Sequence, residues 1–274
     1  MATSGFVDVD GTRLRYEVAG DGPPVVLLHG GWLDLRQWDD QFETFAREFR
    51  VVRYDARGYG RSALGATPYS HHEDLAALIS ALDIDRPQLV GLSNGGAIAV
   101  EFAIWSPRSV RSLVVGAAPM RGHDLGPEFL TGMRAVVVAG AAGRKDECRT
   151  AVWGFEPLRV AGTLPEARRR IDRMIIEDHE FAYARAGAPT RGFLDPPVSV
   201  RFAEITAPTL VVIGDREMPT LAAQGRLMAA AIPGGRVATI AGAGHIVNME
   251  RPAAYEDVVL DWLRAHCSVA PPGD

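Results

Sequence analysis

Cysteine is scarce in this chain: its 274 residues include two, Cys148 and Cys267. They lie far apart in different contexts, and one pair in a chain of this length gives no disulfide framework. The first residues have neither the basic nor the apolar segment of a secretory signal, and no uncharged apolar run reaches the ~18 residues of a membrane span. We therefore expect a soluble, unsecreted protein of the reducing cytoplasm, without a membrane partner.

Other site signatures are also missing from the sequence. No histidine or cysteine pair has metal-ligand spacing, and no Gly-x-Gly-x-x-Gly segment follows an apolar strand, so no metal and no nucleotide cofactor are expected. A formal net charge of -5 without a basic stripe argues against a nucleic-acid partner. With 47% hydrophobic and 23% charged residues, the composition is that of an ordinary globular protein.

What the chain does contain is an alternation of strand-like and helix-like segments. A hairpin over residues 6–18 turns at Asp10-Gly11 and should form an antiparallel edge. The later apolar runs are typical of strands buried on both faces, and the amphipathic segments are typical of covering helices. Strands are predicted at 25–28, 51–54, 88–92, 112–115, 209–213 and 236–240, and helices at 35–48, 71–82, 97–105, 219–231 and 253–266. This order predicts an α/β fold with a mostly parallel, doubly wound sheet.

Residues 120–205 interrupt this alternation. Helical segments are expected at about 128–142, 145–154 and 165–184, and we find no convincing strand among them. Because the alternation resumes afterwards, we predict one core, made of residues 1–119 and 206–274, with a helical lid inserted at 120–205.

The segment Gly91-Leu92-Ser93-Asn94-Gly95-Gly96 stands between a predicted strand and a predicted helix. A turn this sharp holds the serine backbone in a strained region, and side chains at Gly91 or Gly95 would collide with the neighbouring strand or helix. The strain would lift the Ser93 hydroxyl clear of the sheet, beside the N-terminus of the helix, where an oxyanion is favoured. The segment therefore predicts a nucleophilic serine.

A serine hydroxyl needs a base within hydrogen-bond reach, and the usual base is histidine. His245 is the strongest candidate because its loop directly follows a predicted strand, so it should emerge at the same sheet edge as Ser93. His71 and His72 begin a predicted helix and are expected to be exposed. His179 is also more simply a surface residue, although from the lid it could line a pocket.

The acid that orients the histidine should follow the strand at 209–213. Two carboxylates stand there, Asp215 immediately after the strand and Glu217 two residues later, and both cannot easily reach the same imidazole. Asp124 is a third candidate. The residues themselves do not separate Asp215 from Glu217.

Together, these segments resemble the α/β-hydrolase fold superfamily, in its serine esterase and lactonase branch. The resemblance covers nearly the whole chain apart from the lid, and it rests on His29-Gly30, Asp55-x-Arg57-Gly58-x-Gly60-x-Ser62, Gly91-x-Ser93-x-Gly95-Gly96, Gly214-x-x-Glu217 and Gly244-His245 followed by Glu250-Arg251-Pro252. It implies Glu217 as the acid, because the family's acid usually stands three residues after that glycine, although aspartate is more usual. Serine at 93 separates the chain from the aspartate-dependent dehalogenases and epoxide hydrolases.

The implied chemistry is acyl transfer without a cofactor. Ser93 would attack a carbonyl while His245 accepts its proton, and Glu217 would hold the imidazole. Backbone N–H groups of Gly31 and Asn94 would form the oxyanion hole. Arg57 is expected to tie loops together and to take no part in the reaction.

The expected substrate is a small or medium carboxylic ester or lactone, by a loose similarity to enol-lactonases and acyl-homoserine lactonases. Trp32 and Trp153 are predicted to line its pocket. Further lid side chains could line this pocket or belong to the core: Met133, Phe155, Met174, Phe181 and Tyr183. Two alternatives stay open, namely C–C bond hydrolysis of a diketone with the same triad and a low-turnover ligand-binding or biosynthetic role. A homodimer is compatible with the sequence.

Overall fold

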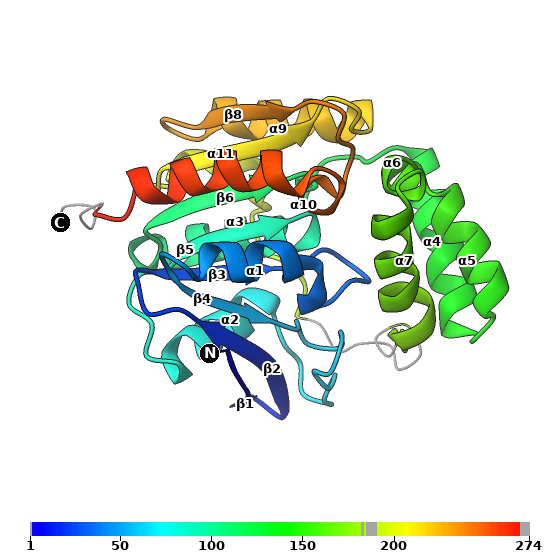
Figure 1. The fold of residues 1–274 in the computed structure, drawn as a ribbon, viewed down its shortest axis with the longest axis horizontal. Coiled ribbons are helices and arrows are strands. Elements are labelled where there is room, and N and C mark those ends of the chain that lie inside the picture. Colours follow the sequence, from blue (N-terminus) through cyan, green and yellow to red (C-terminus); the bar gives the residue numbers. More distant parts are fainter. Residues whose placement is uncertain (1, 182–183, 185–190, 269–274) are drawn as a thin grey trace.

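In a computed structural model that describes residues 2–181, 184 and 191–268, an eight-stranded sheet runs through the molecule (Figure 1). The strand order is β1-β2-β4-β3-β5-β6-β7-β8. Strands β1 (Thr3–Val9) and β2 (Thr12–Ala19) form an antiparallel hairpin at one edge, and β2 pairs antiparallel with β4 (Arg50–Tyr54). The predicted α/β sheet with an antiparallel hairpin at its edge is therefore confirmed.

The remaining strands pair in parallel. They are β3 (Pro24–Leu28), β5 (Gln88–Leu92), β6 (Ser112–Gly116), β7 (Thr209–Gly214) and β8 (Arg236–Ile240). Every residue of β5, β6 and β7 is buried. Their near-continuous apolar sequences follow from this, because helices cover both faces of a parallel sheet.

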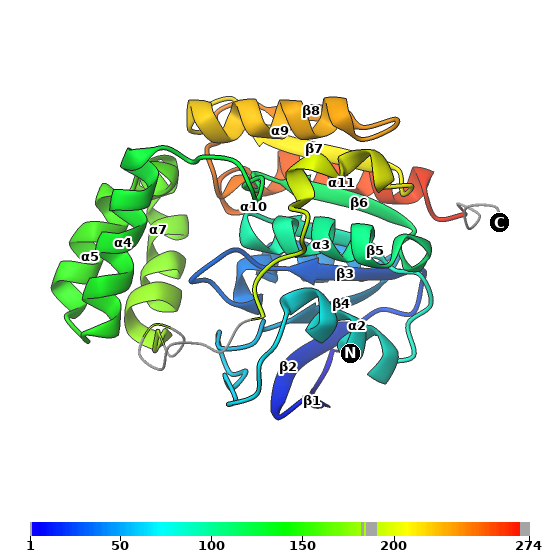
Figure 2. The same cartoon turned by 180° about the vertical axis from the view of Figure 1, so that it is seen from behind.

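Helices cover the two faces of the sheet (Figures 1 and 2). Helices α1 (Asp39–Phe45) and α11 (Pro252–Ala265) pack on one face, and α2 (His71–Ala81), α3 (Asn94–Trp105) and α9 (Pro219–Ala231) pack on the other. The predicted helix at 35–48 is shorter than expected. It begins as a 3-10 turn at Leu35–Trp38, capped by the Asp34 side chain, and α1 ends at Phe45.

Among the described residues between β6 and β7, the helices that follow one another are α4 (Pro127–Ala141), α5 (Lys145–Gly154), α6 (Arg159–Gly162) and α7 (Pro165–Asp172). We call them the inserted helices. They lie at the end of the sheet where its parallel strands finish (Figures 1 and 2). The predicted helix at 165–184 is α7 followed by a π-helical segment, Arg173–Asp178, and its last part reaches residues outside the described ranges. The lid boundaries at 120 and 205 stay predictions.

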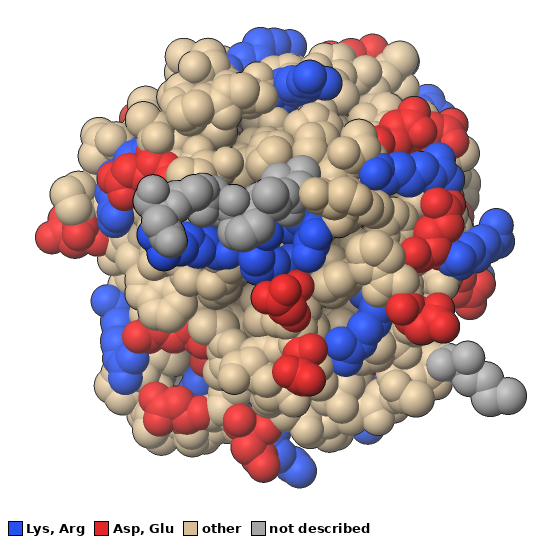
Figure 3. All heavy atoms as spheres, turned by 90° about the vertical axis from the view of Figure 1, so that its left-hand side faces the viewer, with Lys and Arg blue, Asp and Glu red and all other residues tan. Residues whose placement is uncertain are grey.

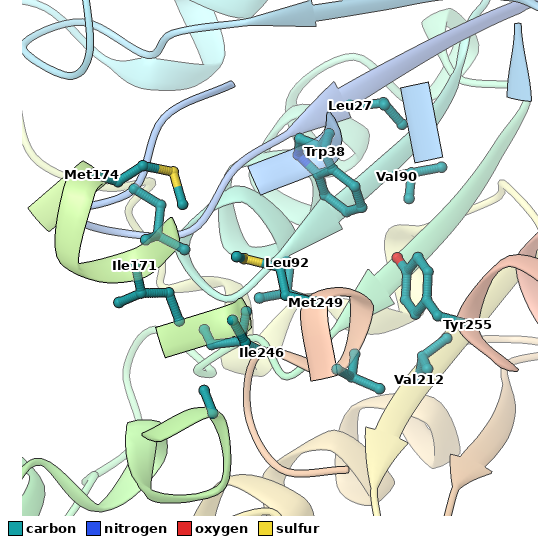
Figure 4. Close-up of a cluster of buried hydrophobic side chains, with 14 of the residues drawn as sticks. Leu27, Trp38, Val90, Leu92, Ile171, Met174, Val212, Ile246, Met249 and Tyr255 are labelled. Carbon is teal, nitrogen blue, oxygen red and sulfur yellow. The ribbon is translucent and has the colours of Figure 1, made fainter. Parts of the chain in front are cut away.

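The inserted helices and the sheet share one hydrophobic core. Ile171 and Met174, from the inserted segment, are at most 2% exposed and belong to the same cluster as Ile246 and Met249 (Figure 4). Burial of apolar surface contributes roughly 25 cal/mol per Å², so this shared cluster anchors the inserted helices over the strand ends.

On the surface opposite the inserted helices, Lys and Arg side chains are interspersed with Asp and Glu wherever described residues show (Figure 3). Within the described ranges, no helix combines the length and the apolar character needed to cross a membrane.

Candidate active site

Ser93 stands at the tip of the turn from β5 to α3, with φ 53° and ψ −118°. Its N–H donates to the carbonyl oxygen of Gly116 at 2.7 Å, which fixes the strained turn against β6. A Cβ added at Gly91 would lie 2.4 Å from the Gly95 carbonyl oxygen, and one added at Gly95 would lie 2.1 Å from that of Leu28. The two glycines are therefore required by close backbone approach, as the sequence predicted.

Three side chains from three loops form one line of hydrogen bonds. His245 Nε2 lies 2.9 Å from Ser93 Oγ, and His245 Nδ1 lies 2.8 Å from Glu217 Oε2. With a proton on Nδ1 donated to the carboxylate, Nε2 is free to accept the serine hydroxyl proton. The structure thus brings together the three residues that the sequence analysis selected.

The surroundings of His245 favour its protonated form. Burial by itself would lower the pKa of the imidazole, but the Glu217 charge and hydrogen bond, with Glu250 further away, raise it above the ordinary histidine value. Glu250 accepts hydrogen bonds from the backbone N–H groups of Gly244 and Ile246, on either side of the histidine. Burial raises the pKa of Glu250, although these bonds oppose the rise. Sequence reasoning gave Glu250 no positioning role.

The structure separates the three candidate acids. Asp215 is exposed and its Oδ1 accepts from the N–H of Gly242 at 2.7 Å, and exposed Asp124 accepts from the N–H of Gly126. Glu217 is 7% exposed and faces His245. Its other oxygen, Oε1, accepts from the N–H of Met218 at 2.7 Å. Of the three, Glu217 alone contacts the imidazole.

The expectation that His71 and His72 are exposed is wrong. His72 is 5% exposed and His71 is half-buried, because the start of α2 packs against α3 and the His72 ring lies 5.6 Å from Trp105. Burial lowers the pKa of His71 to about 3, so it is neutral at neutral pH. His179 is also half-buried, and its ring stacks on Tyr59 at 5.4 Å.

Ser93 and His245 open into a cavity of about 360 Å³. Gly31, Trp32 and Asn94 line it next to the serine, so Trp32 lies in the pocket as predicted, and the oxyanion-hole role of Gly31 and Asn94 stays a prediction. Trp32 has φ 64°, and its ring packs on that of Phe155 at 5.5 Å. Apolar side chains that sequence reasoning did not single out complete the wall: Leu33, Leu125, Phe129, Val137, Leu158, Ile175 and Ile246. The cavity, which we call the acyl cavity, is suited to an apolar group.

Trp153 does not line the acyl cavity, contrary to the prediction. Its Nε1 donates to Asp172 Oδ1 at 3.0 Å, and the Arg168 guanidinium lies 4.7 Å from its ring. Trp153 therefore joins α5 to α7, since the other face of α5 packs inward.

Among the other lid candidates, Met133 and Phe155 line the cavity, Met174 and Phe181 are buried in the core, and Tyr183 is outside the described residues.

Two polar networks hold the loops around the serine. The N–H of Gly30 donates to Gln37 Oε1 at 2.7 Å, Gln37 Nε2 donates to Asn248 Oδ1 at 3.1 Å, and Asn248 Nδ2 donates to Gln41 Oε1 at 3.0 Å. This network joins the Gly30-Gly31 loop to the segment that follows His245.

Arg57 forms a two-point pair with Asp74 at 2.6 and 2.8 Å, and it also donates to the Asp10 carbonyl oxygen, as expected of a residue that ties loops together.

Among the described residues, no group of three or more His, Cys, Asp or Glu side chains has an arrangement that could hold a metal ion.

A doubly wound sheet with a strained serine after its fifth strand, hydrogen-bonded to a histidine and an acid at the same edge, is the arrangement of an α/β hydrolase. The family model described as "Alpha/beta hydrolase family" matches residues 25–258, so the chain belongs to this family. The predicted membership is confirmed.

The similarity to known proteins extends over nearly the whole chain. It is 30% identical over 288 residues to a 2-hydroxy-6-oxononadienedioate/2-hydroxy-6-oxononatrienedioate hydrolase of Cupriavidus pinatubonensis, with 95% of each chain covered. It is similar to the enol-lactonase of Burkholderia xenovorans, with 26% identity, TM-score 0.79 and coverage of 95% of this chain and 100% of that one. It is also similar to a thermophilic esterase of Thermogutta terrifontis, with 25% identity, TM-score 0.75 and coverage of 98% and 100%.

Proposed function

We propose that this α/β hydrolase cleaves a small or medium carboxylic ester or lactone through an acyl-enzyme on Ser93. The observation that carries the proposal is the continuous line from Glu217 through His245 to Ser93 Oγ, with separations of 2.8 and 2.9 Å, at the wall of the acyl cavity. Similarity to an enol-lactonase and to an esterase supports this choice of substrate.

The proposed mechanism uses these three side chains and two backbone N–H groups. Ser93 Oγ attacks the substrate carbonyl while its proton passes to His245 Nε2, and the Glu217 carboxylate stabilises the imidazolium. Backbone N–H groups of Asn94, at the start of α3, and of Gly31 would hold the oxyanion. The imidazolium then protonates the leaving alkoxide, and in the second half-reaction His245 takes a proton from the water that cleaves the acyl-enzyme.

The test is covalent labelling. We expect one fluorophosphonate adduct per chain by intact mass, which maps to Ser93 and vanishes in Ser93→Ala, followed by turnover of members of an ester and lactone panel. A folded protein that forms no adduct would contradict an activated serine. It would favour the ligand-binding alternative.

C–C bond hydrolysis is the second candidate. It is favoured by the 30% identity to the hydrolase of Cupriavidus pinatubonensis and needs the same three side chains. Identification of the products separates the two: an ester or lactone yields an acid and a hydroxyl group, whereas a cleaved diketone yields an acid and a ketone.

A further inference from the structure

A second cavity, of about 480 Å³, lies beside the acyl cavity. The two share wall residues: Tyr59, Asn94, Pro119, Leu125 and Met133 line both. Asn94, the residue after Ser93, therefore faces both cavities, and the second cavity lies next to the nucleophile. We call this second space the polar cavity, because Arg121, Glu101 and His71 belong to its wall.

The guanidinium of Arg121 lies in the wall of the polar cavity and contacts Asn94 and Phe193. Its side chain is 10% exposed, and Nη2 donates to the side-chain oxygen of Asn94 at 3.0 Å. The Arg121 Cζ lies over the ring of Phe193, 3.8 Å from the ring centre. A guanidinium held over an aromatic face keeps its N–H groups available for hydrogen bonds.

Glu101 balances the Arg121 charge only in part. Its Oε1 lies 3.6 Å from Arg121 Nη1, beyond hydrogen-bond distance, and accepts no hydrogen bond from the described residues. Burial lowers the pKa of Arg121 despite the opposing effects of Glu101 and Tyr59. A guanidinium has five N–H donors, and among the described residues the Asn94 oxygen is the one acceptor within hydrogen-bond distance of Arg121, while Glu101 lies at ion-pair distance. Donors therefore remain for a ligand.

We infer that the polar cavity binds a carboxylate of the substrate through Arg121, so the substrate is an ester or lactone that carries a free carboxylate on a short chain. The planar guanidinium matches a carboxylate in shape. Because the buried carboxylate of Glu101 lines the same cavity and already offsets part of the Arg121 charge, a singly charged group fits better than a doubly charged phosphate. This inference rests on the proposed function, since it places the scissile carbonyl at Ser93.

The test compares two esters that differ at the far carboxyl group, which is charged in one and methylated in the other. One is the mono-p-nitrophenyl ester of glutaric acid, and the other is its neutral methyl p-nitrophenyl diester; succinate and adipate analogues vary the chain length. We expect kcat/KM of the wild type to favour the charged monoester by about 10- to 100-fold at low salt, as for a charge-assisted hydrogen bond. In Arg121→Gln this ratio should fall to about 1.

The matched control is Arg134→Gln. It removes the same charge from an exposed position of α4, and it should keep the wild-type ratio. Because Arg121→Gln leaves Glu101 buried without a partner and can unfold the protein, the double variant Arg121→Gln/Glu101→Gln is measured in parallel. Its ratio should also be about 1.

Three outcomes would overturn the inference. A wild type that prefers the neutral diester has no carboxylate site. Equal losses on both esters in Arg121→Gln, with the ratio kept, would mean that Arg121 only positions Asn94. Absence of both ester turnover and a fluorophosphonate adduct would remove the proposed function and this inference with it, whereas an adduct on Ser93 without preference for the monoester removes the inference alone.

Discussion

His245 Nδ1 lies 2.8 Å from Glu217 Oε2, whereas Asp215, two residues earlier in the same turn, accepts from the Gly242 N–H instead. The turn after β7 thus directs one carboxylate at the imidazole and the other at the surface. We expect Glu217→Ala to lower kcat by about 10⁴-fold, as loss of the orienting acid does in such triads. Asp215→Ala, the matched control, should change kcat by less than about 3-fold. Steady-state kinetics on one ester would decide, and the opposite ranking would mean that the acid is wrongly assigned.

The pH profile should report the interaction of His245 with Glu217. Only the neutral imidazole can accept the Ser93 proton, and the Glu217 charge raises the imidazole pKa. Activity of the wild type should therefore be lost on acidification at a pH above the ordinary histidine value of about 6.5. In Glu217→Gln the charge that raises the imidazole pKa is gone, and burial lowers that pKa. The acidic limb of kcat/KM should therefore move to lower pH, and the plateau value of kcat/KM should drop. An unchanged midpoint would argue against His245 as the titrating base.

Glycine at position 95 should be needed for folding. A Cβ there would lie 2.1 Å from the Leu28 carbonyl oxygen, and neither backbone can move freely where the start of α3 packs on β3. We expect Gly95→Ala to lower the free energy of unfolding by roughly 3 kcal/mol or more, measured by urea denaturation. Gly154→Ala is the control, because no atom lies within 4 Å of its Cβ position. It should be neutral or slightly stabilising.

The Arg57–Asp74 pair should contribute to stability and not to chemistry. The Arg57 side chain is fully buried and that of Asp74 is 5% exposed. Arg57→Met leaves a buried carboxylate without its partner, so we expect a loss of about 3–5 kcal/mol. Arg264→Met removes an exposed pair with Glu48 that solvent screens, so the free energy of unfolding should stay close to the wild-type value. Similar losses of unfolding free energy in both variants, measured by thermal and urea unfolding, would show that burial of an ion pair does not decide its contribution to stability.

Two adjacent valines of α4 test the acyl cavity. Val137 lines the cavity, whereas Val138, the next residue, is 50% exposed. Val137→Phe should fill part of the space, so kcat/KM for p-nitrophenyl octanoate should fall by about 10-fold or more relative to the acetate ester. Val138→Phe should leave that ratio at its wild-type value. A parallel fall in both variants would indicate that α4 does not form the wall of the acyl site.

The nucleophile turn could be predicted because its causes are local. Gly91 leaves room for the backbone of Gly95, four residues later, and Gly95 leaves room for the backbone of Leu28 in the adjacent strand β3. A sharp strand-to-helix turn also requires the strained serine between the two glycines. The sheet could be predicted for a similar reason, since strands buried on both faces carry apolar side chains at every position.

The sequence did not show where side chains on loops and helices point. Trp153 was predicted in the pocket, but it hydrogen-bonds Asp172. His72 was predicted at the surface, but α2 packs against α3 and buries it. In each case, the residue's own helix has two or more faces, and the neighbouring helix decides which one is covered.

The sequence by itself therefore determined the α/β sheet, the strained serine and the sheet edge at which a histidine and an acid follow their strands. Tertiary structure decided which carboxylate reaches His245. A Cβ at Gly214 would lie 2.2 Å from the Ala243 carbonyl oxygen, so the two loops pass in contact, and Glu217 meets His245 beside that contact. It also placed Arg121 beside Asn94, although 27 residues separate them. Such pairings depend on how distant segments pack, and the spacing of residues along a chain carries no record of that packing.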